Sequence, residues 1–330
     1  MSEKIVLTGI QPTGMPHLGN YVGALKPLIK MSQTHRTFMF IADLHSLNAI
    51  KDPAVIKQHT YEAAAIVLSL GLNLDNAVLF RQSDIAEIPQ LSTMLMNVTP
   101  KGLMNRAHSY KANVDKNVEA GADPDAGINM GLYTYPVLMA ADILMYNSVL
   151  VPVGADQKQH VEFTRDIAGY FNHTYGETLK IPEPVIGRET GIIPGLDGRK
   201  MSKSYDNTIP LFAPVGELKK KVMRIITDSK QPSDAKDPDE STIFQLYKHF
   251  ATDEEIAELR EKFIAGGMGY GVAKTILFEK IDSVLSGPRA EYERLMANKS
   301  ELDAILANGA KHARAVASET LDRVRRAMLG

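Results

Sequence analysis

Two short segments, far apart in the chain, carry side chains suited to binding phosphate. The first, Pro16-His17-Leu18-Gly19-Asn20, follows an apolar run and a turn and begins a helical pattern. A helix amino terminus offers free N–H groups and partial positive charge, so it attracts phosphate. His17 can donate a further hydrogen bond, and Gly19 lets a flat base approach the backbone. The plainer alternative is an ordinary strand–turn–helix connection that His17 caps.

The second segment is Gly198-Arg199-Lys200-Met201-Ser202-Lys203-Ser204. Two lysines with interleaved serines on a glycine-flanked loop form a cationic clamp that can follow negative charge as pyrophosphate leaves. Stabilising charge that develops in a transition state is usually the largest catalytic effect. A Lys-Ser run alone is commonly a solvated loop. The two segments together are far more specific, and they predict a nucleotide-binding site.

The elements that must position these segments alternate between strands and helices in the first half of the chain. Apolar runs predict strands at 4–8, 37–42, 77–81 and 148–153, and helical patterns follow at 18–32, 53–70, after Pro89, at 131–146 and to about 171. This order predicts a parallel, doubly wound sheet, which binds ligands beyond the carboxyl ends of its strands. Residues that follow strand ends should therefore share one crevice; they are Gln11, His17, Asp43 and His45.

The second half of the chain is predicted to be helical. Helical patterns cover 215–227, 240–250, 253–265, 271–285, 288–296, 301–307 and 310–328, and a domain boundary is expected near 206–214. Residues 100–130 are polar and irregular, and residues 181–205 are rich in glycine and proline. The run Gly266-Gly267-Met268-Gly269-Tyr270-Gly271 has no strand before it, so it indicates a helix end and restart rather than a phosphate loop.

Composition narrows the classes of protein. The 330 residues are 44% hydrophobic and 23% charged, which is typical of a globular chain with two domains. Without cysteine there is no disulfide, thiolate metal site or catalytic thiol, and the nine histidines lack zinc-ligand spacing. No signal peptide is visible, and the most apolar stretch, 132–146, is too short to span a bilayer, so we expect a cytoplasmic protein. The net charge of −2 gives no hint of nucleic acid.

The two segments resemble the signatures of class I aminoacyl-tRNA synthetases, with His17-Leu18-Gly19-Asn20 in place of His-Ile-Gly-His and an exact Lys-Met-Ser-Lys-Ser at 200–204. The resemblance narrows to the bacterial tryptophanyl-tRNA synthetases. The stretches that carry it are 9–14, 19–24, 135–144, 156–162, 269–271 and 315–321. It covers essentially the whole chain, and it implies L-tryptophan, ATP with Mg²⁺ and tRNA(Trp) as substrates and partners, with no permanently bound metal and no membrane.

The predicted helix at 131–146 fits this resemblance. Tyr135, Met139, Asp142 and Tyr146 are spaced by four, three and four residues, so they share one face. Burying Asp142 unpaired would be costly, and an indole N–H is a fitting partner because it can only donate. Such a site rejects analogues that lack the donor by roughly 10⁴–10⁵, which excludes phenylalanine, whereas tyrosine must be excluded by shape. Alternatively, Asp142 pairs internally with a Ser, Tyr or Arg, and Tyr135 and Met139 are core residues.

The resemblance also assigns residues to ligands. Catalytic roles fall to His17, Asn20, Lys200 and Lys203. ATP is expected to contact Gln11, Thr13, Gly19, Asn20, Lys111, Gly154, Asp156, Gln157, Ile193, Lys200, Met201, Ser202, Lys203 and Ser204. Tryptophan is expected to contact Leu7, Gly9, His45, Tyr135, Met139, Asp142 and Gln157. By spacing alone, Lys111 is one exposed lysine in a polar loop.

Three positions depart from the family pattern. Asn20 replaces the last signature histidine but still offers a hydrogen-bond donor, as is common among tryptophan enzymes. Ala155 stands where relatives often have Glu, so a role for that carboxylate is in doubt here. Leu7 replaces an aromatic residue of some relatives, which changes the packing expected around the indole.

The resemblance implies a Rossmann-like α/β catalytic domain over 1–210, with an inserted dimerisation region at about 100–185. An all-helical anticodon-binding domain then covers 211–330, and its last helix can pack back on the catalytic domain. The resemblance implies a homodimer. Lys219-Lys220-Lys221 is more readily a solvated helix face than a tRNA contact.

Three rival functions remain open. A tyrosyl-tRNA synthetase shares the fold but is expected to carry a further carboxyl-terminal RNA-binding module. A small-molecule adenylyltransferase of the same superfamily usually lacks the exact Lys-Met-Ser-Lys-Ser loop together with a long helical tail. A non-catalytic paralogue is disfavoured by intact His17, Lys200 and Lys203.

Overall fold

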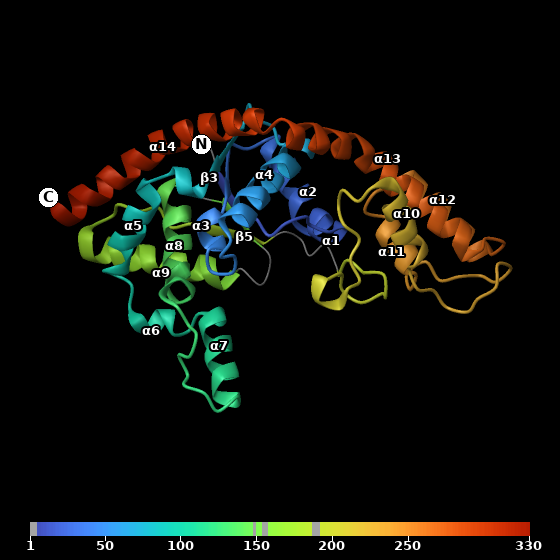
Figure 1. Ribbon diagram of the computed structural model, residues 1–330, viewed down its shortest axis with the longest axis horizontal. Coiled ribbons are helices and arrows are strands. Elements are labelled where there is room, and N and C mark those ends of the chain that lie inside the picture. The colour runs from blue at the N-terminus through green and yellow to red at the C-terminus, as the bar shows by residue number, and fades with distance from the viewer. Residues whose placement is uncertain (1–4, 148–149, 154–157, 187–191) are drawn as a thin grey trace.

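A five-stranded parallel sheet lies at the centre of the first half of the chain (Figure 1). The computed structural model describes residues 5–147, 150–153, 158–186 and 192–330. The strands run β3-β2-β1-β4-β5 across the sheet; they are β1 (Val6–Ile10), β2 (Thr37–Ile41), β3 (Ala77–Arg81), β4 (Leu150–Val153) and β5 (Glu183–Ile186). Strand order reverses direction between β1 and β4, which is where doubly wound sheets bind ligands. The predicted Rossmann-like α/β fold is confirmed.

Side-chain alternation along β1 and β2 divides the core between the two faces of the sheet. Leu7, Phe38 and Phe40 pack into one apolar cluster, with α5 (Glu87–Met96), α8 (Met130–Met145) and α9 (Lys158–Tyr175). Met39 and Ile41 point to the opposite cluster, which contains α4 (Pro53–Ser69) and much of the helical second half. This period of two is the expected geometry of a strand that is buried on both faces.

Three predicted elements differ from the structure in the first half. The helix expected at 18–32 consists of α1 (Leu18–Asn20), a π-helical turn (Tyr21–Leu25) and α2 (Lys26–Ser32). β5 was missed because its region reads as a Gly/Pro-rich loop; as an edge strand it tolerates Pro184. Residues 100–130 are not irregular, since they contain α6 (Lys101–Met104) and α7 (His108–Glu119). The sequence of α7 lacks an apolar face. The helix accordingly buries no residue and projects away from the sheet (Figure 1).

The second half is helical, as predicted, but with fewer breaks. It contains α10 (Val215–Met223), α11 (Thr242–Tyr247), α12 (Asp253–Ala265), α13 (Tyr270–Ala297) and α14 (Lys299–Leu329). The predicted interruptions near 286–287 and 308–309 are wrong, because α13 continues through Pro288 and α14 through Gly309. The helix end before α13 is confirmed: Gly266 has a φ of 73° at the end of α12, and Gly269 caps α13.

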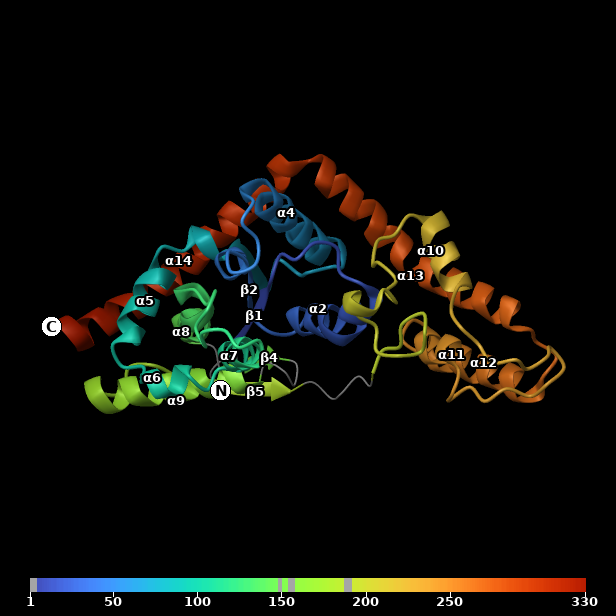
Figure 2. The ribbon, with the colours of Figure 1, turned by 60° about the horizontal axis from the view of Figure 1, so that its bottom comes forward.

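The last helix covers the outer edge of the sheet. α14 follows α13 after a bend at Asn298 and crosses β3 and α5 (Figure 2). A Cβ at Gly309 would lie 1.8 Å from the Leu79 carbonyl oxygen of β3, so only glycine permits this approach. Arg314 of α14 donates to the buried Glu87 of α5, which lowers the pKa of that carboxyl despite its burial. The helical half of the chain is thereby fastened to the edge strand of the sheet.

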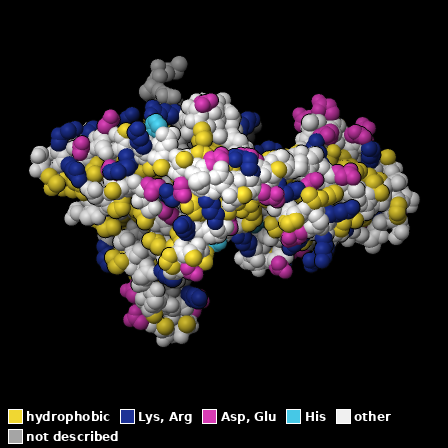
Figure 3. Space-filling model, turned by 45° about the horizontal axis from the view of Figure 1, so that its top comes forward, with side chains coloured by type: hydrophobic (Ala, Val, Ile, Leu, Met, Phe, Trp, Pro, Cys, Tyr) yellow, Lys and Arg dark blue, Asp and Glu magenta, His cyan; other side chains and the backbone are white. Residues whose placement is uncertain are grey.

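The face formed by α13 and α14 carries interspersed acidic and basic side chains (Figure 3). Lys219 and Lys220 are exposed on α10, as expected of a solvated helix face, and the Lys219 ammonium lies 5.6 Å from the Phe278 ring centroid.

Within the described ranges, no helix is long and apolar enough to cross a membrane.

Candidate active site

The two segments that the sequence predicts to bind phosphate meet in the folded chain. The Gly19 N–H donates to the Met201 sulfur at 3.3 Å across a separation of 182 residues, and the Lys203 ammonium lies 3.4 Å from the Thr13 carbonyl oxygen. Backbone hydrogen bonds of 2.9 Å join Leu18 to Ile209 and Leu211 to Pro16. These contacts hold the lysine loop against the start of α1.

His17 caps the helix and keeps one nitrogen for another partner. Its Nδ1 accepts from the Asn20 N–H at 3.3 Å, while Asn20 Oδ1 accepts from the His17 N–H at 3.1 Å. Burial and then the nearby Lys203 lower the pKa of His17. A neutral imidazole that accepts at Nδ1 must carry its proton on Nε2. The capping alternative and the phosphate-donor hypothesis are therefore compatible, because they use different ring nitrogens.

The lysine loop has an anchored backbone and exposed ammonium groups. Asn207, which is 2% exposed, accepts from the Ser202 N–H at 2.8 Å and donates to Asp197 and the Lys200 carbonyl. Met201 is also buried, whereas Lys200 and Lys203 are exposed. The anchor fixes where the loop sits, while its charges remain able to follow a ligand. Sequence reasoning missed Asn207, since nothing but its proximity to the motif distinguishes it.

Asp142 of α8 is fully buried and accepts hydrogen bonds from two neighbouring side chains. Its two oxygens accept from Gln82 Nε2 at 2.9 and 2.8 Å, and Oδ2 lies 3.1 Å from His45 Nε2. Burial raises the pKa of Asp142, and the hydrogen bond from His45 opposes that rise. Internal pairing is thus observed, but with Gln82 and His45 rather than the Ser, Tyr or Arg that we considered.

Gln82 is the residue that the sequence could have revealed. It begins the 3₁₀ turn Gln82–Asp84 directly after β3, at the same sheet edge as His45 of α3 (Asp43–Ser46), which follows β2. The rule that singled out residues at strand ends applies equally to it. Asp43 ties these two turns together by accepting from the N–H and hydroxyl of Ser83.

Tyr135 extends this polar cluster toward α7 and α9. Its hydroxyl lies 2.6 Å from His160 Nε2 and 3.1 Å from the Ser109 hydroxyl, and its ring meets His45 edge-on at 6.4 Å between centroids. Met139, one helical turn away, packs partly buried against the same core. The predicted face of α8 therefore gathers Tyr135, Met139 and Asp142, although Tyr146 is buried in the core, stacked on Phe38.

The remaining expected residues differ in placement. Leu7 is 1% exposed and packs within the core, and Gly9 must lack a side chain because a Cβ would lie 2.5 Å from the Phe40 ring. Gln11 and Thr13 are exposed in the turn after β1. Ile193 is buried and accepts from the Met201 N–H at 2.9 Å. Gly154, Ala155, Asp156, Gln157 and Gly191 lie outside the described residues.

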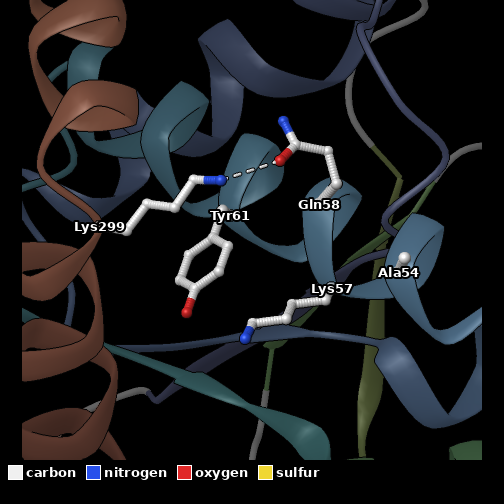
Figure 4. A pocket seen from close by; sticks show the side chains of 5 residues that line it. All are labelled: Ala54, Lys57, Gln58, Tyr61 and Lys299. Atoms are coloured by element: carbon white, nitrogen blue, oxygen red, sulfur yellow. Dashed lines mark hydrogen bonds between the residues drawn. The ribbon is translucent and has the colours of Figure 1, made fainter.

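Two further features take no part in the hydrogen bonds described above. Lys111 is exposed on α7, where its ammonium makes no hydrogen bond or ion pair with any residue that the structure describes. A pocket beside α4 is lined by Ala54, Lys57, Gln58, Tyr61 and Lys299 (Figure 4). There the Lys299 ammonium donates to Gln58 Oε1 at 3.1 Å and lies 5.3 Å from the centre of the Tyr61 ring. These contacts fasten α14 to α4, and none of the candidate site residues lines the pocket.

Comparison with known proteins agrees with this arrangement. Residues 2–321 match the family model of tRNA synthetases class I (W and Y). The tryptophan–tRNA ligase of Pseudomonas aeruginosa is 51% identical over 98% of this chain and 73% of its own length, and that of Neisseria meningitidis is 49% identical over 99% and 98%. The tryptophanyl-tRNA synthetase of Campylobacter jejuni, solved with ADP and tryptophan, superposes with a TM-score of 0.89 at 41% identity, covering 98% of both chains.

The chain therefore belongs to the class I tRNA synthetases for tryptophan and tyrosine, in their bacterial tryptophanyl group.

Proposed function

We propose that this chain is a tryptophan–tRNA ligase, which activates L-tryptophan with ATP and transfers it to tRNA(Trp). The observation that carries the proposal is the meeting of two distant segments, where Gly19 contacts Met201 and Lys203 reaches Thr13. The buried carboxylate of Asp142 at the same edge of the sheet supplies the substrate contact. About half of the residues are shared with bacterial tryptophan–tRNA ligases, which supports the same assignment.

In the activation step, a carboxylate oxygen of tryptophan attacks the α-phosphorus of ATP in line. A new P–O bond forms, the bond between the α- and β-phosphates breaks, and pyrophosphate leaves with the bonding electron pair. The nucleophile is already ionised, so catalysis is positioning plus charge stabilisation and needs no base. His17 donates through Nε2, Asn20 through its amide, and Lys200 and Lys203 follow the departing pyrophosphate.

The wider ATP site takes in the turn after β1, the lysine loop and the start of α1. Its members in this proposal are Gln11, Thr13, Gly19, Asn20, Lys111, Gly154, Asp156, Gln157, Ile193 and residues 200–204. Tryptophan lies against the opposite part of the crevice, where the Asp142 carboxylate accepts from the indole N–H. The other proposed tryptophan contacts are Leu7, Gly9, His45, Tyr135, Met139 and Gln157.

Magnesium accompanies ATP in this proposal. Among the described residues there is no group of three or more His, Asp or Glu side chains that could hold a metal ion. Mg²⁺ keeps several waters and is commonly bound through substrate phosphates. We therefore assign its ligands to ATP oxygens and water, where it neutralises phosphate charge.

In the second step the 2′-hydroxyl of the terminal ribose of tRNA, which class I enzymes use, attacks the carbonyl carbon of tryptophanyl-adenylate. An ester bond forms, the bond between the carbonyl carbon and the phosphate oxygen breaks, AMP leaves, and the hydroxyl proton passes to the AMP phosphate or to water. We assign the catalytic domain to residues 1–210. We assign anticodon binding to the helical residues 211–330, which would recognise the single-stranded anticodon bases by their edges. We also propose a homodimer formed through the region at about 100–185. A cytoplasmic location follows from this function, because the tRNA substrate resides there.

Amino-acid-dependent ATP–pyrophosphate exchange tests the proposal directly. Each of the twenty amino acids is supplied separately, and we expect exchange with tryptophan alone. Exchange with tyrosine would assign the chain to the sister enzyme. No exchange with any amino acid, in protein whose far-ultraviolet circular dichroism shows it folded, would contradict the proposed activity. Charging of a tRNA(Trp) transcript, with a tRNA(Tyr) transcript as the control, tests the second step.

A further inference from the structure

We propose that Gln82 is a positioning residue, which holds the Asp142 carboxylate as an acceptor for an N–H donor and so sets the preference for indole. This inference rests on the proposed function, and it concerns a residue that touches Asp142 rather than the reacting atoms. The hydrogen bonds from Gln82 Nε2 to both oxygens of Asp142 carry it.

The contacts of Gln82 and His45 with Asp142 are unequal. Gln82 and Asp142 are both 0% exposed, and the amide reaches Oδ1 and Oδ2 at 2.9 and 2.8 Å. His45 reaches only Oδ2, and its side chain is 16% exposed. The Asp142 carboxylate is therefore held by a fully buried amide. This amide belongs to the turn after β3 and not to α8, the helix that bears Asp142. A donor that spans both oxygens fixes the rotation of the carboxyl group.

The amide leaves room for one more donor. An ionised carboxylate has about four acceptor positions, and the three observed contacts leave capacity for an indole N–H. A lysine or arginine at position 82 would neutralise Asp142 by itself, whereas an amide donates without adding charge. A ligand N–H that reaches Asp142 therefore still adds a favourable hydrogen bond. A ligand without an N–H at that point obtains no binding free energy from the carboxylate.

The other end of the same amide supports this role. Gln82 Oε1 is buried and has no hydrogen-bond partner among the described residues. Leaving a buried acceptor unpaired destabilises the folded protein. Rotating the amide would turn this oxygen toward the carboxylate, where two acceptors repel. The amide of Gln82 therefore keeps the orientation that donates to Asp142, although this orientation leaves its own oxygen unpaired.

Several charged or titratable groups surround Asp142 and shape its response to pH. His45 faces it from α3 and stabilises the carboxylate, while Asp43 on the same turn raises the pKa of Asp142. On α8 itself, Tyr146 has a pKa raised by burial and by Asp142. Removing the Gln82 N–H groups further disfavours the charged form, so protonation should begin at a higher pH.

The test compares Gln82→Met with the wild-type protein in tryptophan-dependent pyrophosphate exchange. We expect KM for tryptophan to rise roughly 10–100-fold, because a hydrogen bond to a charged group contributes about 1.5–3 kcal/mol. We expect kcat and KM for ATP to stay within threefold. The acidic limb of kcat/KM for tryptophan should also move to higher pH. Gln90→Met on α5, an exposed glutamine, is the matched control and should change none of these values.

A tryptophan analogue with sulfur in place of the indole nitrogen separates positioning from general packing. Wild type should prefer tryptophan strongly, and Gln82→Met should lose most of that preference. Gln82→Glu provides a second variant with nearly unchanged shape. Two adjacent carboxyl groups share one proton, so this variant should bind tryptophan best at low pH, the reverse of Gln82→Met.

The outcomes distinguish this inference from the proposed function. If wild type shows no tryptophan-dependent exchange, the proposed function fails first. If wild type is active and Gln82→Met keeps its KM for tryptophan within twofold, the positioning role is wrong. A parallel rise of KM for ATP and tryptophan, with unchanged discrimination against the analogue, would likewise reduce Gln82 to a packing residue. Should Gln82→Met not fold, the pH response of Gln82→Glu decides.

Discussion

The two parts of the candidate active site are built in opposite ways. Around Asp142, the carboxylate and Gln82 are fully buried and the His45 side chain is 16% exposed, and donors from two different turns of the chain converge on one carboxylate. In the lysine loop the backbone is anchored through Asn207, while Lys200 and Lys203 are exposed and the Lys203 ammonium lies 3.4 Å from the Thr13 carbonyl oxygen. The contacts around Asp142 are made by packed side chains in the protein interior. The lysine loop is anchored by its backbone, and its lysine side chains are exposed.

This difference suits the two tasks that we propose for these parts. Discrimination between amino acids requires that a wrong ligand leave buried polar groups unpaired, which only a rigid, desolvated site enforces. Stabilising a departing pyrophosphate requires charge that follows a moving group, which a rigid site could not supply. The shared sheet edge brings both parts of the candidate site to one side of the sheet, since β1, β2 and β3 all end there.

The largest expected effect on activity comes from a substitution in the lysine loop. Lys203→Ala should lower the rate of tryptophan activation by roughly 10²–10³, as removal of one transition-state donor does in comparable sites. The KM for tryptophan should change little, because Lys203 contacts the other half of the crevice. Arg199→Ala is the control: Arg199 lies in the same loop but is paired with Asp197. Pyrophosphate exchange by Lys203→Ala within a few-fold of wild type would remove Lys203 from its assigned role.

The contacts around Asp142 predict the opposite kinetic pattern. Asp142→Ala should reduce kcat/KM for tryptophan by about 10²-fold, since it deletes a charged hydrogen-bond partner, while ATP binding is retained. Asp142→Asn, which keeps the shape, should retain part of the affinity. Equilibrium binding of tryptophan and ATP, measured separately by calorimetry, checks both statements. Unchanged tryptophan affinity in Asp142→Ala would exclude this carboxylate from the pocket.

A substitution remote from both parts should affect neither selectively. Gly309→Ala places a Cβ into the Leu79 carbonyl, and overpacking of this kind costs about 1–3 kcal/mol of unfolding free energy. Gly287→Ala on α13 is the matched control, because no atom lies within 4 Å of its Cβ position. Urea unfolding should show the loss only for Gly309→Ala. A selective change in KM for one substrate would instead link α14 to one part of the site.

Much of the fold could be predicted because its signals are local. The apolar runs of β1, β2 and β3 and the alternation with helices specify a doubly wound sheet. Failures occurred where tertiary contacts override local pattern. Gly309 looks like a helix break, yet it allows α14 to approach β3, and Pro288 lies within a long helix whose packing compensates for the lost hydrogen bond. α7 has no apolar face, so periodicity could not reveal it.

The site was predictable where chemistry and sequence position coincide. His17, Lys200 and Lys203 stand in short motifs, and Asp142 is conspicuous as a charge in an apolar helix. Gln82 and Asn207 are different, because their roles depend on which distant side chain they meet. The position of Gln82 after β3 could have placed it at the sheet edge, but the fold alone brings its partner Asp142 to it across a separation of 60 residues.

The covering of β3 by α14 has a consequence for biosynthesis. Glu87 and its partner Arg314 are 227 residues apart, and ribosomes add about 5–20 residues per second. The sheet edge is therefore made roughly 10–50 s before the helix that covers it. During that interval the growing chain carries an open strand edge, which is a template for pairing with other chains. Until α14 is made, the β3 edge of this protein is therefore exposed to such pairing.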